Sequence, residues 1–283
     1  MKTLEKPCRL NLTKIGRCYR LRKETALITG ASNGIGREYS YYLAEKGYNM
    51  ILVSRSKSKL DELAADLQER YIVDATVIVQ DLSEEWAATH VYEKVTEKNL
   101  TVDMLINNAG FGTTGNFLGS SETDTHKQVM LNVNAVVNMT QKFLPDMENR
   151  GSGAIINIAS TSSFLPIPYM SVYAATKAFV LSFSESLHKE YRGKGIRFLA
   201  VCPGTTETDF FDSAPDTITA GGMRTTRQVV HTSYKALNKG KNYVVDGKLN
   251  YLISLSPRIF SRKSMLRITS AMMKRNMARS SSK

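Results

Sequence analysis

The chain has 283 residues, of which 42% are hydrophobic, and its 38 basic and 26 acidic residues give a formal net charge of +12. It contains no run of eighteen apolar residues and no apolar N-terminal region, so neither a transmembrane span nor a secretory signal is predicted. Its three cysteines and four histidines show neither a disulfide framework nor metal-ligand spacing, which predicts a reducing compartment and no metal site.

Short apolar segments alternate with helix-length segments along most of the chain. The apolar segments are Ala26–Thr29, Met50–Ser54, Thr76–Val79, Met104–Ile106, Ala154–Ile158, Arg197–Val201 and Asn242–Val245. Lys57–Tyr71 and Glu84–Lys98 are two of the helix-length segments. Near-continuous apolar strands joined by helices are typical of a parallel sheet that is covered on both faces. We therefore predict an α/β fold, a single doubly wound domain with a seven-stranded parallel sheet.

A glycine-rich turn follows the first predicted strand. Glycines at such a turn permit tight backbone geometry and allow N–H groups at a helix N-terminus to approach a pyrophosphate. The spacing is TGxxxGxG, and a turn of this kind is a weak signal alone, because many strand–helix loops carry two glycines. The residues that it places for cofactor binding are Gly30, Ser32, Asn33, Gly34, Ile35 and Gly36.

The second predicted strand ends without an acidic residue. Ser54 and Arg55 stand where an NAD-specific protein usually presents Asp or Glu to the ribose 2′-hydroxyl. A guanidinium can bind a 2′-phosphate bidentately, whereas a carboxylate would repel it. Lys57 and Lys59 add positive charge, although the three basic residues could equally form a solvated helix start. We predict NADP(H) in preference to NAD(H).

Further motifs follow the later predicted strands. Asp81-Leu82 follows the third strand, and Pro203-Gly204 follows the sixth. The sequence NNAG follows the fourth strand and contributes Asn108, Ala109 and Gly110. Ligands of doubly wound folds bind outside the carboxyl ends of the strands, so these motifs support the interpretation of the glycine-rich turn as part of a nucleotide site.

Tyr173 and Lys177 stand four residues apart in VYAATKAFV, thirteen residues after Ser160. Positions i and i+4 share a face of a helix, so the ammonium of Lys177 can lie beside the phenol. A fixed cation there is expected to lower the phenol's pKa from about 10 towards the working range. Ser160, at the end of an apolar strand, could hold a substrate oxygen beside Tyr173. If the pair stood alone, an incidental Tyr and Lys on an amphipathic helix would be the favoured interpretation.

The order and spacing of TGxxxGxG, NNAG, the serine and YxxxK resemble the classical short-chain dehydrogenase/reductase family over roughly Lys23 to Gly247. The resemblance implies a Rossmann-type fold with Ser160, Tyr173 and Lys177 as the catalytic trio. It implies NADPH-dependent reduction of a ketone, or the reverse oxidation of a secondary alcohol. It also implies a homodimer or homotetramer.

The same resemblance assigns roles outside the trio. Asn134, in MLNVNAVV, matches the helix asparagine that positions a water in the proton relay, and Asn132 and Asn138 are its neighbours in sequence. Asp81 would contact the adenine ring, and Thr208, in PGTTET, would reach the nicotinamide carboxamide.

Substrate and activity are implied less directly. The sequence SSFLPIPYMSVYAATKAFV and the basic C-terminal extension resemble the branch with hydroxysteroid dehydrogenases and long-chain ketoacyl reductases, which implies a lipid-like ketone. Phe111, Phe164, Leu165, Ile167, Tyr169 and Met170 could line its pocket or be ordinary core residues. Thr205–Met223 stands where the family places a mobile substrate lid. The alternative is a catalytically weak NADP-binding sensor. Such relatives usually lose Tyr or Lys, and this chain keeps both.

Positive charge is concentrated at the two ends. Residues 1–23 have a net charge of +7 and residues 247–283 carry nine basic residues and no acid, whereas residues 24–246 have a net charge of −4. We therefore expect a basic N-terminal extension (1–23), a catalytic domain (24–246) and a basic, amphipathic C-terminal extension (247–283), here called the C-terminal tail.

The C-terminal tail interleaves apolar and basic residues. A helix there would have an apolar side and a basic side, which is compatible with an anionic membrane surface. The alternative is that the apolar side packs on the domain or on a second subunit. No nucleic-acid recognition motif accompanies the basic ends, so no such partner is predicted. We expect a cytoplasmic location, with peripheral membrane association through the tail as its variant.

Overall fold

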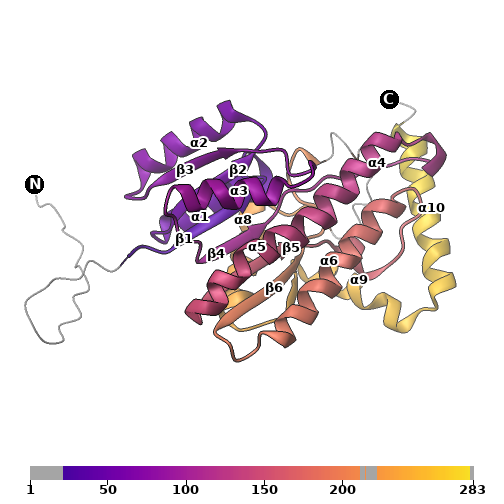
Figure 1. Cartoon of the computed structure of the whole chain (residues 1–283). Helices are drawn as coiled ribbons and strands as arrows, with labels where there is room; N and C mark the ends of the chain where they lie inside the picture. The colour runs from indigo at the N-terminus through magenta and orange to yellow at the C-terminus, as the bar shows by residue number, and fades with distance from the viewer. Residues whose placement is uncertain (1–21, 211–213, 215–221, 281–283) are drawn as a thin grey trace, which may run out of the picture.

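The protein is represented by a computed structural model that describes residues 22–210, 214 and 222–280. Its centre is a seven-stranded parallel sheet with the order β3-β2-β1-β4-β5-β6-β7 (Figure 1). The strands are β1 Thr25–Thr29, β2 Asn49–Ser54, β3 Ala75–Val79, β4 Met104–Asn107, β5 Gly153–Ile158, β6 Ile196–Cys202 and β7 Tyr243–Val245. The predicted fold class is confirmed, and every predicted strand is present within one residue at each end.

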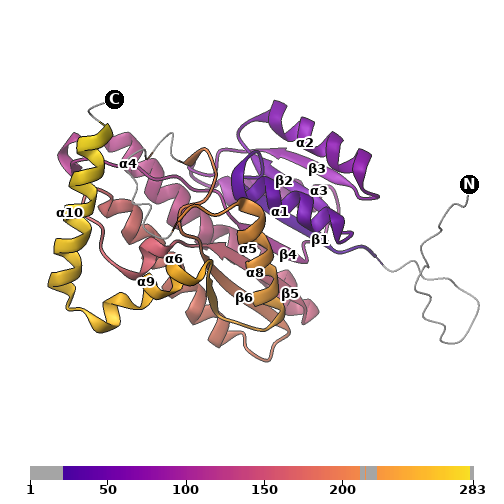
Figure 2. The same cartoon turned by 180° about the vertical axis from the view of Figure 1, so that it is seen from behind.

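Helices cover both faces of the sheet. They are α1 Gly34–Glu45, α2 Lys57–Arg70, α3 Ala87–Glu97, α4 Glu122–Val129, α5 Ala135–Arg150, α6 Ser171–Glu190, α8 Thr226–Asn238, α9 Lys248–Ile259 and α10 Arg262–Ser280. Figure 1 shows α3, α5 and α6 in front of the sheet, and Figure 2, from behind, shows α1 and α8 over the other face. Burial on both faces explains the near-continuous apolar strands, since all five residues of β1 are buried.

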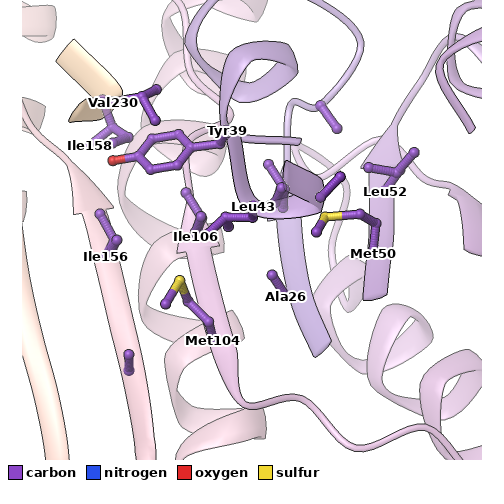
Figure 3. Packing of buried hydrophobic residues seen from close by; sticks show 14 of the residues in the cluster. Ala26, Tyr39, Leu43, Met50, Leu52, Met104, Ile106, Ile156, Ile158 and Val230 are labelled. Carbon is purple, nitrogen blue, oxygen red and sulfur yellow. The ribbon is translucent and has the colours of Figure 1, made fainter. Parts of the chain in front are cut away.

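Tyr39 of α1 illustrates how a helix packs on the sheet. Its ring lies among Ile106 and Ile158 of the sheet and Val230 of α8 (Figure 3). Its hydroxyl forms a hydrogen bond with Ser233 of α8, so the buried polar atom has a partner. Aliphatic packing and one satisfied hydroxyl thus fix α1 and α8 over the strands that lead into the site.

The strand order reverses beside β1. The chain passes from β1 to β2 and β3 on one side and then returns to β4 on the other, so Ala26 pairs with both Met50 and Met104. The loops after β1 and β4 therefore diverge and leave a crevice at the carboxyl edge of the sheet. In open α/β sheets this is where ligands bind.

Helix α3 begins three residues later than the sequence predicts. Trp86 adopts a left-handed backbone conformation (φ 61°) directly before Ala87, and this ends the preceding turn. In that turn the backbone N–H and the hydroxyl of Ser83 both donate to Asp81 Oδ1, at 2.9 and 2.7 Å. Local side chain to backbone bonding of this kind competes with helix formation.

The C-terminal tail forms two helices, and α10 lies at the end of the molecule that carries α4 (Figures 1 and 2). Met265, Thr269 and Met273 of α10 are buried, and Thr269 Oγ1 donates to Pro166 O at 3.3 Å. Met273 belongs to the apolar cluster that contains Tyr173. One side of α10 therefore packs on the body of the chain before the tail, as the packing alternative predicts.

Candidate active site

A cavity of about 680 Å³ opens at the carboxyl edge of the sheet, a volume within the usual range of ligand sites. Loops that follow the first six strands line it. The predicted site residues in its walls are Gly30, Ser32, Asn33, Gly34, Ile35, Ser54, Arg55, Asp81, Leu82, Asn108, Ala109, Gly110, Ser160, Tyr173, Lys177, Pro203, Gly204 and Thr208. The structure thus brings the predicted cofactor and catalytic residues into one cavity, with the exceptions of Gly36 and Asn134.

The glycine-rich turn forms a cradle that side chains would fill. Gly30 and Gly34 have positive φ angles of 64° and 54°, which favour glycine. A Cβ on Gly34 would lie 3.0 Å from Thr208 Cγ2. Gly36 does not line the cavity, and its expected cofactor contact stays a prediction; a Cβ there would collide with Gly30 O and with the side chain of Asn108. Gly36 permits close packing of α1 on the turn.

The NNAG loop is bonded to the end of β1. Asn108 Nδ2 donates to the carbonyl oxygens of Thr29 and Gly30, at 2.9 and 3.2 Å. Thr29 Oγ1 accepts hydrogen bonds from the backbone N–H groups of Asn108 and Ala109, at 2.9 and 3.0 Å. These bonds fix the loops after β1 and β4, which flank the crevice where the strand order reverses. Thr29 is the threonine of the TGxxxGxG motif, but its bonds to the NNAG loop are not evident from the sequence, because they form only when β1 and β4 pair.

Ser54 and Arg55, at the end of β2, have polar groups that the rest of the described protein bonds only in part. Ser54 Oγ is buried, and among the described residues it has no hydrogen-bond partner. Arg55 NH1 is 3.8 Å from Asp81 Oδ2, and the Arg55 side chain is 77% exposed. Lys59 also lines the cavity, whereas Lys57 forms an ion pair on its own helix and does not. An orphaned hydroxyl and two cations beside the glycine cradle fit a dinucleotide that carries an additional phosphate.

Ser160 and the pair on α6 converge at the other end of the cavity. A hydrogen bond joins the side chains of Ser160 and Tyr173. Lys177 Nζ donates to Ile158 O at 2.7 Å and lies 5.9 Å from the centre of the Tyr173 ring. The three side chains are buried, with exposures of 5–8%. The predicted trio is therefore assembled around a point accessible from the cavity.

Burial is the largest influence on the pKa values of Tyr173 and Lys177. It raises the pKa of Tyr173 to about 12, and the hydrogen bond with Ser160 offsets the rise only in part. It lowers the pKa of Lys177 to about 8. The expectation that Lys177 lowers the pKa of Tyr173 is wrong for this structure, because Nζ faces the ring and bonds to Ile158 O. The phenol therefore holds its proton at neutral pH, as a proton donor requires.

The asparagine next to the trio is Asn132, and the expected position of Asn134 is corrected. Asn132 is fully buried, and its Nδ2 donates to Phe111 O and Thr176 Oγ1, at 2.9 and 3.1 Å. Its Oδ1 accepts from Phe111 N at 3.1 Å. Asn134 is partly exposed, and none of the hydrogen bonds found in the described part of the chain joins it to these groups.

Two features of the backbone explain why Asn132 is the one that reaches the site. Met130–Asn134 forms a π-helical turn, which contains an extra residue and rotates the side chains relative to an α-helix. Gly110 then separates Asn132 from Lys177, since a Cβ on Gly110 would lie 2.9 Å from Asn132 Oδ1 and 3.4 Å from Lys177 Nζ.

We predict that Asn132→Ala lowers kcat about 10–100-fold, because misplaced catalytic groups lose rate steeply. It should also lower the free energy of unfolding by about 1–3 kcal/mol, since Phe111 and Thr176 lose buried partners. The matched control, Asn134→Ala, should keep kcat within about twofold. Steady-state kinetics and urea unfolding measure both effects. Equal losses of kcat in the two variants would contradict the assignment of Asn132.

Several further residues line the cavity besides those predicted as site residues. Lys127 of α4 adds a cation. Asn33 Nδ2 donates to Asp209 Oδ2 at 2.9 Å, which joins the glycine-rich turn to the segment after β6. The ring of Phe210 lies 5.2 Å from that of Tyr173. The remaining ones are Val53, Ser56, Gln80, Ser83, Asp124, Leu131, Ile158, Ala159, Thr161, Ser162, Thr205 and Thr206.

The apolar residues considered for a substrate pocket divide into three groups. Phe111 lines the cavity. Phe164 packs with the cluster of α6 and β6. The others pack in the cluster around Met273 and do not line the cavity: Leu165, Ile167, Tyr169 and Met170.

Some expectations fall outside the described residues. These include Cys8, Cys18, nearly all of the N-terminal extension, and Phe211 with most of the expected lid. Within the described ranges, Cys202 is buried and no cluster of His, Cys, Asp and Glu could hold a metal ion. No helix in those ranges combines the length and apolar character needed to cross a membrane.

Comparison with known proteins gives consistent matches. The family model described as short chain dehydrogenase matches residues 24–219. The human very-long-chain 3-oxoacyl-CoA reductase is 39% identical over 186 residues, which are 64% of this chain and 58% of that protein. The enzyme of the same name from Rattus norvegicus is 31% identical over 249 residues, covering 86% of this chain and 78% of that one. The match thus spans little more than half of the human relative.

Solved structures agree with these sequence matches. A short-chain dehydrogenase from Sphingobium yanoikuyae in complex with NADPH has a TM-score of 0.74 and 32% identity, covering 78% of this chain and 87% of that one. A bulky-bulky ketone specific alcohol dehydrogenase from Comamonas testosteroni has a TM-score of 0.71 and 32% identity, covering 83% and 93%. With the seven-stranded sheet and the assembled Ser, Tyr and Lys, these matches show that the chain belongs to the short-chain dehydrogenase family.

Proposed function

We propose that the protein reduces the ketone of a lipid-like substrate with NADPH, a 3-oxoacyl thioester being the best-supported class. The observation that carries the proposal is the shared cavity, in which the glycine cradle and Arg55 lie at one end and Ser160, Tyr173 and Lys177 at the other. The relatives suggest the substrate class, since they are very-long-chain 3-oxoacyl-CoA reductases. The catalytic unit in this proposal is residues 24–246.

The proposed chemistry divides between the cofactor and the protein. A bound NADPH supplies the hydride, and the protein supplies orientation and the proton. Ser160 hydrogen-bonds the substrate oxygen and holds it near Tyr173. Tyr173, whose pKa burial raises to about 12, keeps its proton until the oxygen gains charge and then donates it. Lys177, which is buried with its Nζ 5.9 Å from the centre of the Tyr173 ring, would position the cofactor ribose.

The preference for NADPH rests on charge at the end of β2. Arg55 and Lys59 face the cavity, and no acid occupies the strand end. The Sphingobium yanoikuyae relative was solved with NADPH. Arg55 NH1 forms a long ion pair with Asp81 Oδ2 at 3.8 Å, and the Arg55 side chain is 77% exposed, so the guanidinium keeps N–H groups for a phosphate.

The test is oxidation of NADPH, followed by absorbance, with a panel of 3-oxoacyl thioesters of increasing chain length, hydroxysteroid ketones, quinones and small ketones. We expect the highest kcat/KM with the long 3-oxoacyl thioesters. Fast turnover of small ketones alone would contradict the proposal of a lipid-like substrate but would still support a reductase. Tight binding of NADPH without turnover of any compound would favour the sensor alternative.

We also propose that the enzyme works as a homodimer or homotetramer. We further propose that the C-terminal tail contacts an anionic membrane. Of fifteen exposed large hydrophobic residues in the described chain, seven lie in α9, α10 and the link between them. They are Leu249, Tyr251, Leu252, Ile259, Phe260, Leu266 and Ile268. Arg258, Arg262, Lys263 and Arg267 are exposed among them, and the tail has no acid. This combination is typical of helices that lie on anionic lipid and supports a cytoplasmic enzyme with peripheral membrane association.

We predict salt-sensitive co-sedimentation with vesicles that contain phosphatidylserine, to which each well-placed basic residue contributes about 1 kcal/mol. Replacing Arg262, Lys263 and Arg267 by Glu should abolish the binding. The matched control replaces three exposed lysines elsewhere, Lys98, Lys189 and Lys239, by Glu and should keep most of it. If the full chain at low salt does not bind, or both triple variants lose binding equally, the tail is not the membrane contact.

A further inference from the structure

A buried carboxylate lies directly after β7. Asp246 is fully buried, and its oxygens accept hydrogen bonds from Arg224 Nε at 2.8 Å, Arg224 NH2 at 3.1 Å and Thr232 Oγ1 at 2.7 Å. The Arg224 side chain is 30% exposed. A buried charge is retained only when it is paired and hydrogen-bonded in this way, so the ion pair has a fixed bidentate geometry.

The backbone of Arg224 is bonded to the segment after β6. Arg224 N donates to Thr205 O and Glu207 N donates to Arg224 O, both at 2.9 Å. Arg224 also forms an isolated parallel bridge with Thr206. Fixing the Arg224 side chain on Asp246 therefore fixes residues 205–207, which lead directly into Thr208 and the wall of the cavity.

Helix α9 holds the same segment from its other end. Asn250 Nδ2 donates to Asp246 O at 2.7 Å, and the Asn250 side chain packs so closely on Gly204 that a Cβ there would collide with it. Asp246 N donates to Cys202 O at 3.3 Å. Asp246 thus bonds to the end of β6 through its backbone and to the segment beyond it through Arg224.

We propose that the Arg224–Asp246 ion pair is a positioning clamp that sets the affinity for NADPH by holding Thr208 in the cavity. The inference rests on the proposed function, in which Thr208 contacts the cofactor. Neither Arg224 nor Asp246 lines the cavity, so both act through the 205–208 segment. The clamp also makes the start of the C-terminal tail part of the cofactor site, although α9 lies outside the proposed catalytic unit.

The test compares Asp246→Asn, Thr208→Val and the double variant by fluorescence titration with NADPH. Asp246→Asn keeps the side-chain shape but turns an amide towards the guanidinium, and we expect about tenfold weaker binding. Because the clamp acts through Thr208, the second substitution should add less than about twofold to the first. Thr232→Val, which removes one bond to Asp246, should weaken binding in the same direction and keeps the test available if Asp246→Asn folds poorly.

Amide hydrogen exchange without ligand provides an independent readout. The Glu207 amide should exchange about tenfold faster in Asp246→Asn, because its acceptor Arg224 O is released. Glu148→Gln breaks the exposed Lys194–Glu148 ion pair elsewhere and is the control, with unchanged NADPH affinity and Glu207 exchange. The clamp would be overturned if Asp246→Asn and Thr208→Val weakened NADPH binding by factors that multiply in the double variant. It would also be overturned if the Glu207 amide exchanged at an unchanged rate in Asp246→Asn. A native protein that shows no NADPH binding would instead overturn the proposed function, and the exchange result would still decide whether the clamp holds residues 205–207.

Discussion

Tyr173→Phe should reduce turnover with the best ketone of the panel by about 10²–10⁴-fold, the usual contribution of a positioned general acid. The substitution removes one oxygen and leaves the ring, so the packing of Tyr173 against Phe210 at 5.2 Å is retained. NADPH affinity should stay within about threefold, and the lost hydrogen bond with Ser160 should cost only about 1 kcal/mol of stability.

Stopped-flow kinetics, NADPH titration and urea unfolding together measure these quantities. Lys177→Ala is the informative partner variant, because it should lower both turnover and NADPH affinity. Appreciable steady-state turnover in Tyr173→Phe, with the fold intact, would mean that another group donates the proton and would end the proposed mechanism.

Arg55→Asp should weaken NADPH binding by about 2–4 kcal/mol, or about 30- to 700-fold, through loss of a charge-assisted pair and new repulsion of the 2′-phosphate. NADH lacks this phosphate, so its affinity should change far less. The effect requires the guanidinium itself, which lies at the cavity on a side chain that is 77% exposed.

Lys57→Asp is a matched control for Arg55→Asp. It makes the same change of charge two residues away, but Lys57 does not line the cavity and is paired with Asp61. Calorimetry with NADPH and NADH on the three proteins separates specific recognition from general charge. Equal affinity of the native protein for both cofactors, or equal losses in both variants, would defeat the assigned role of Arg55.

The fold could be predicted because burial on both faces gives the strands a strong sequence signal. β5 illustrates this: all six residues of Gly153–Ile158 are buried, and the apolar run in the sequence differs from the strand by one residue. The glycine-rich turn and NNAG also predict much of the cavity, since each follows a strand whose end forms its wall, and YxxxK predicts the part that α6 contributes. The start of α3 was misplaced because the bonds from Ser83 to Asp81 replace helical ones there.

The errors at the site arise from geometry that motif spacing does not contain. Asn132 and Asn134 differ by two positions, and only the π-helical turn decides which one faces Gly110 and Lys177. The pKa of Tyr173 depends on how deeply the ring is buried, which its four-residue spacing from Lys177 does not reveal. Lys127 has no motif, and only the packing of α4 brings it to the cavity.

The strand order has a consequence for how the protein acquires its site. Ala26 in β1 must pair with Met104 in β4, and every described pair of strands in the sheet is parallel. When two distant segments pair in parallel, the chain loses loop-closure entropy before the new contacts compensate for it. This loss slows folding and prolongs the exposure of unpaired strand edges. During synthesis the glycine-rich turn therefore emerges long before its partner loop after β4, and Thr208 emerges after both. We expect a nascent chain to become able to bind NADPH only late in synthesis, so ligand binding by stalled chains of increasing length would report the moment at which the sheet closes.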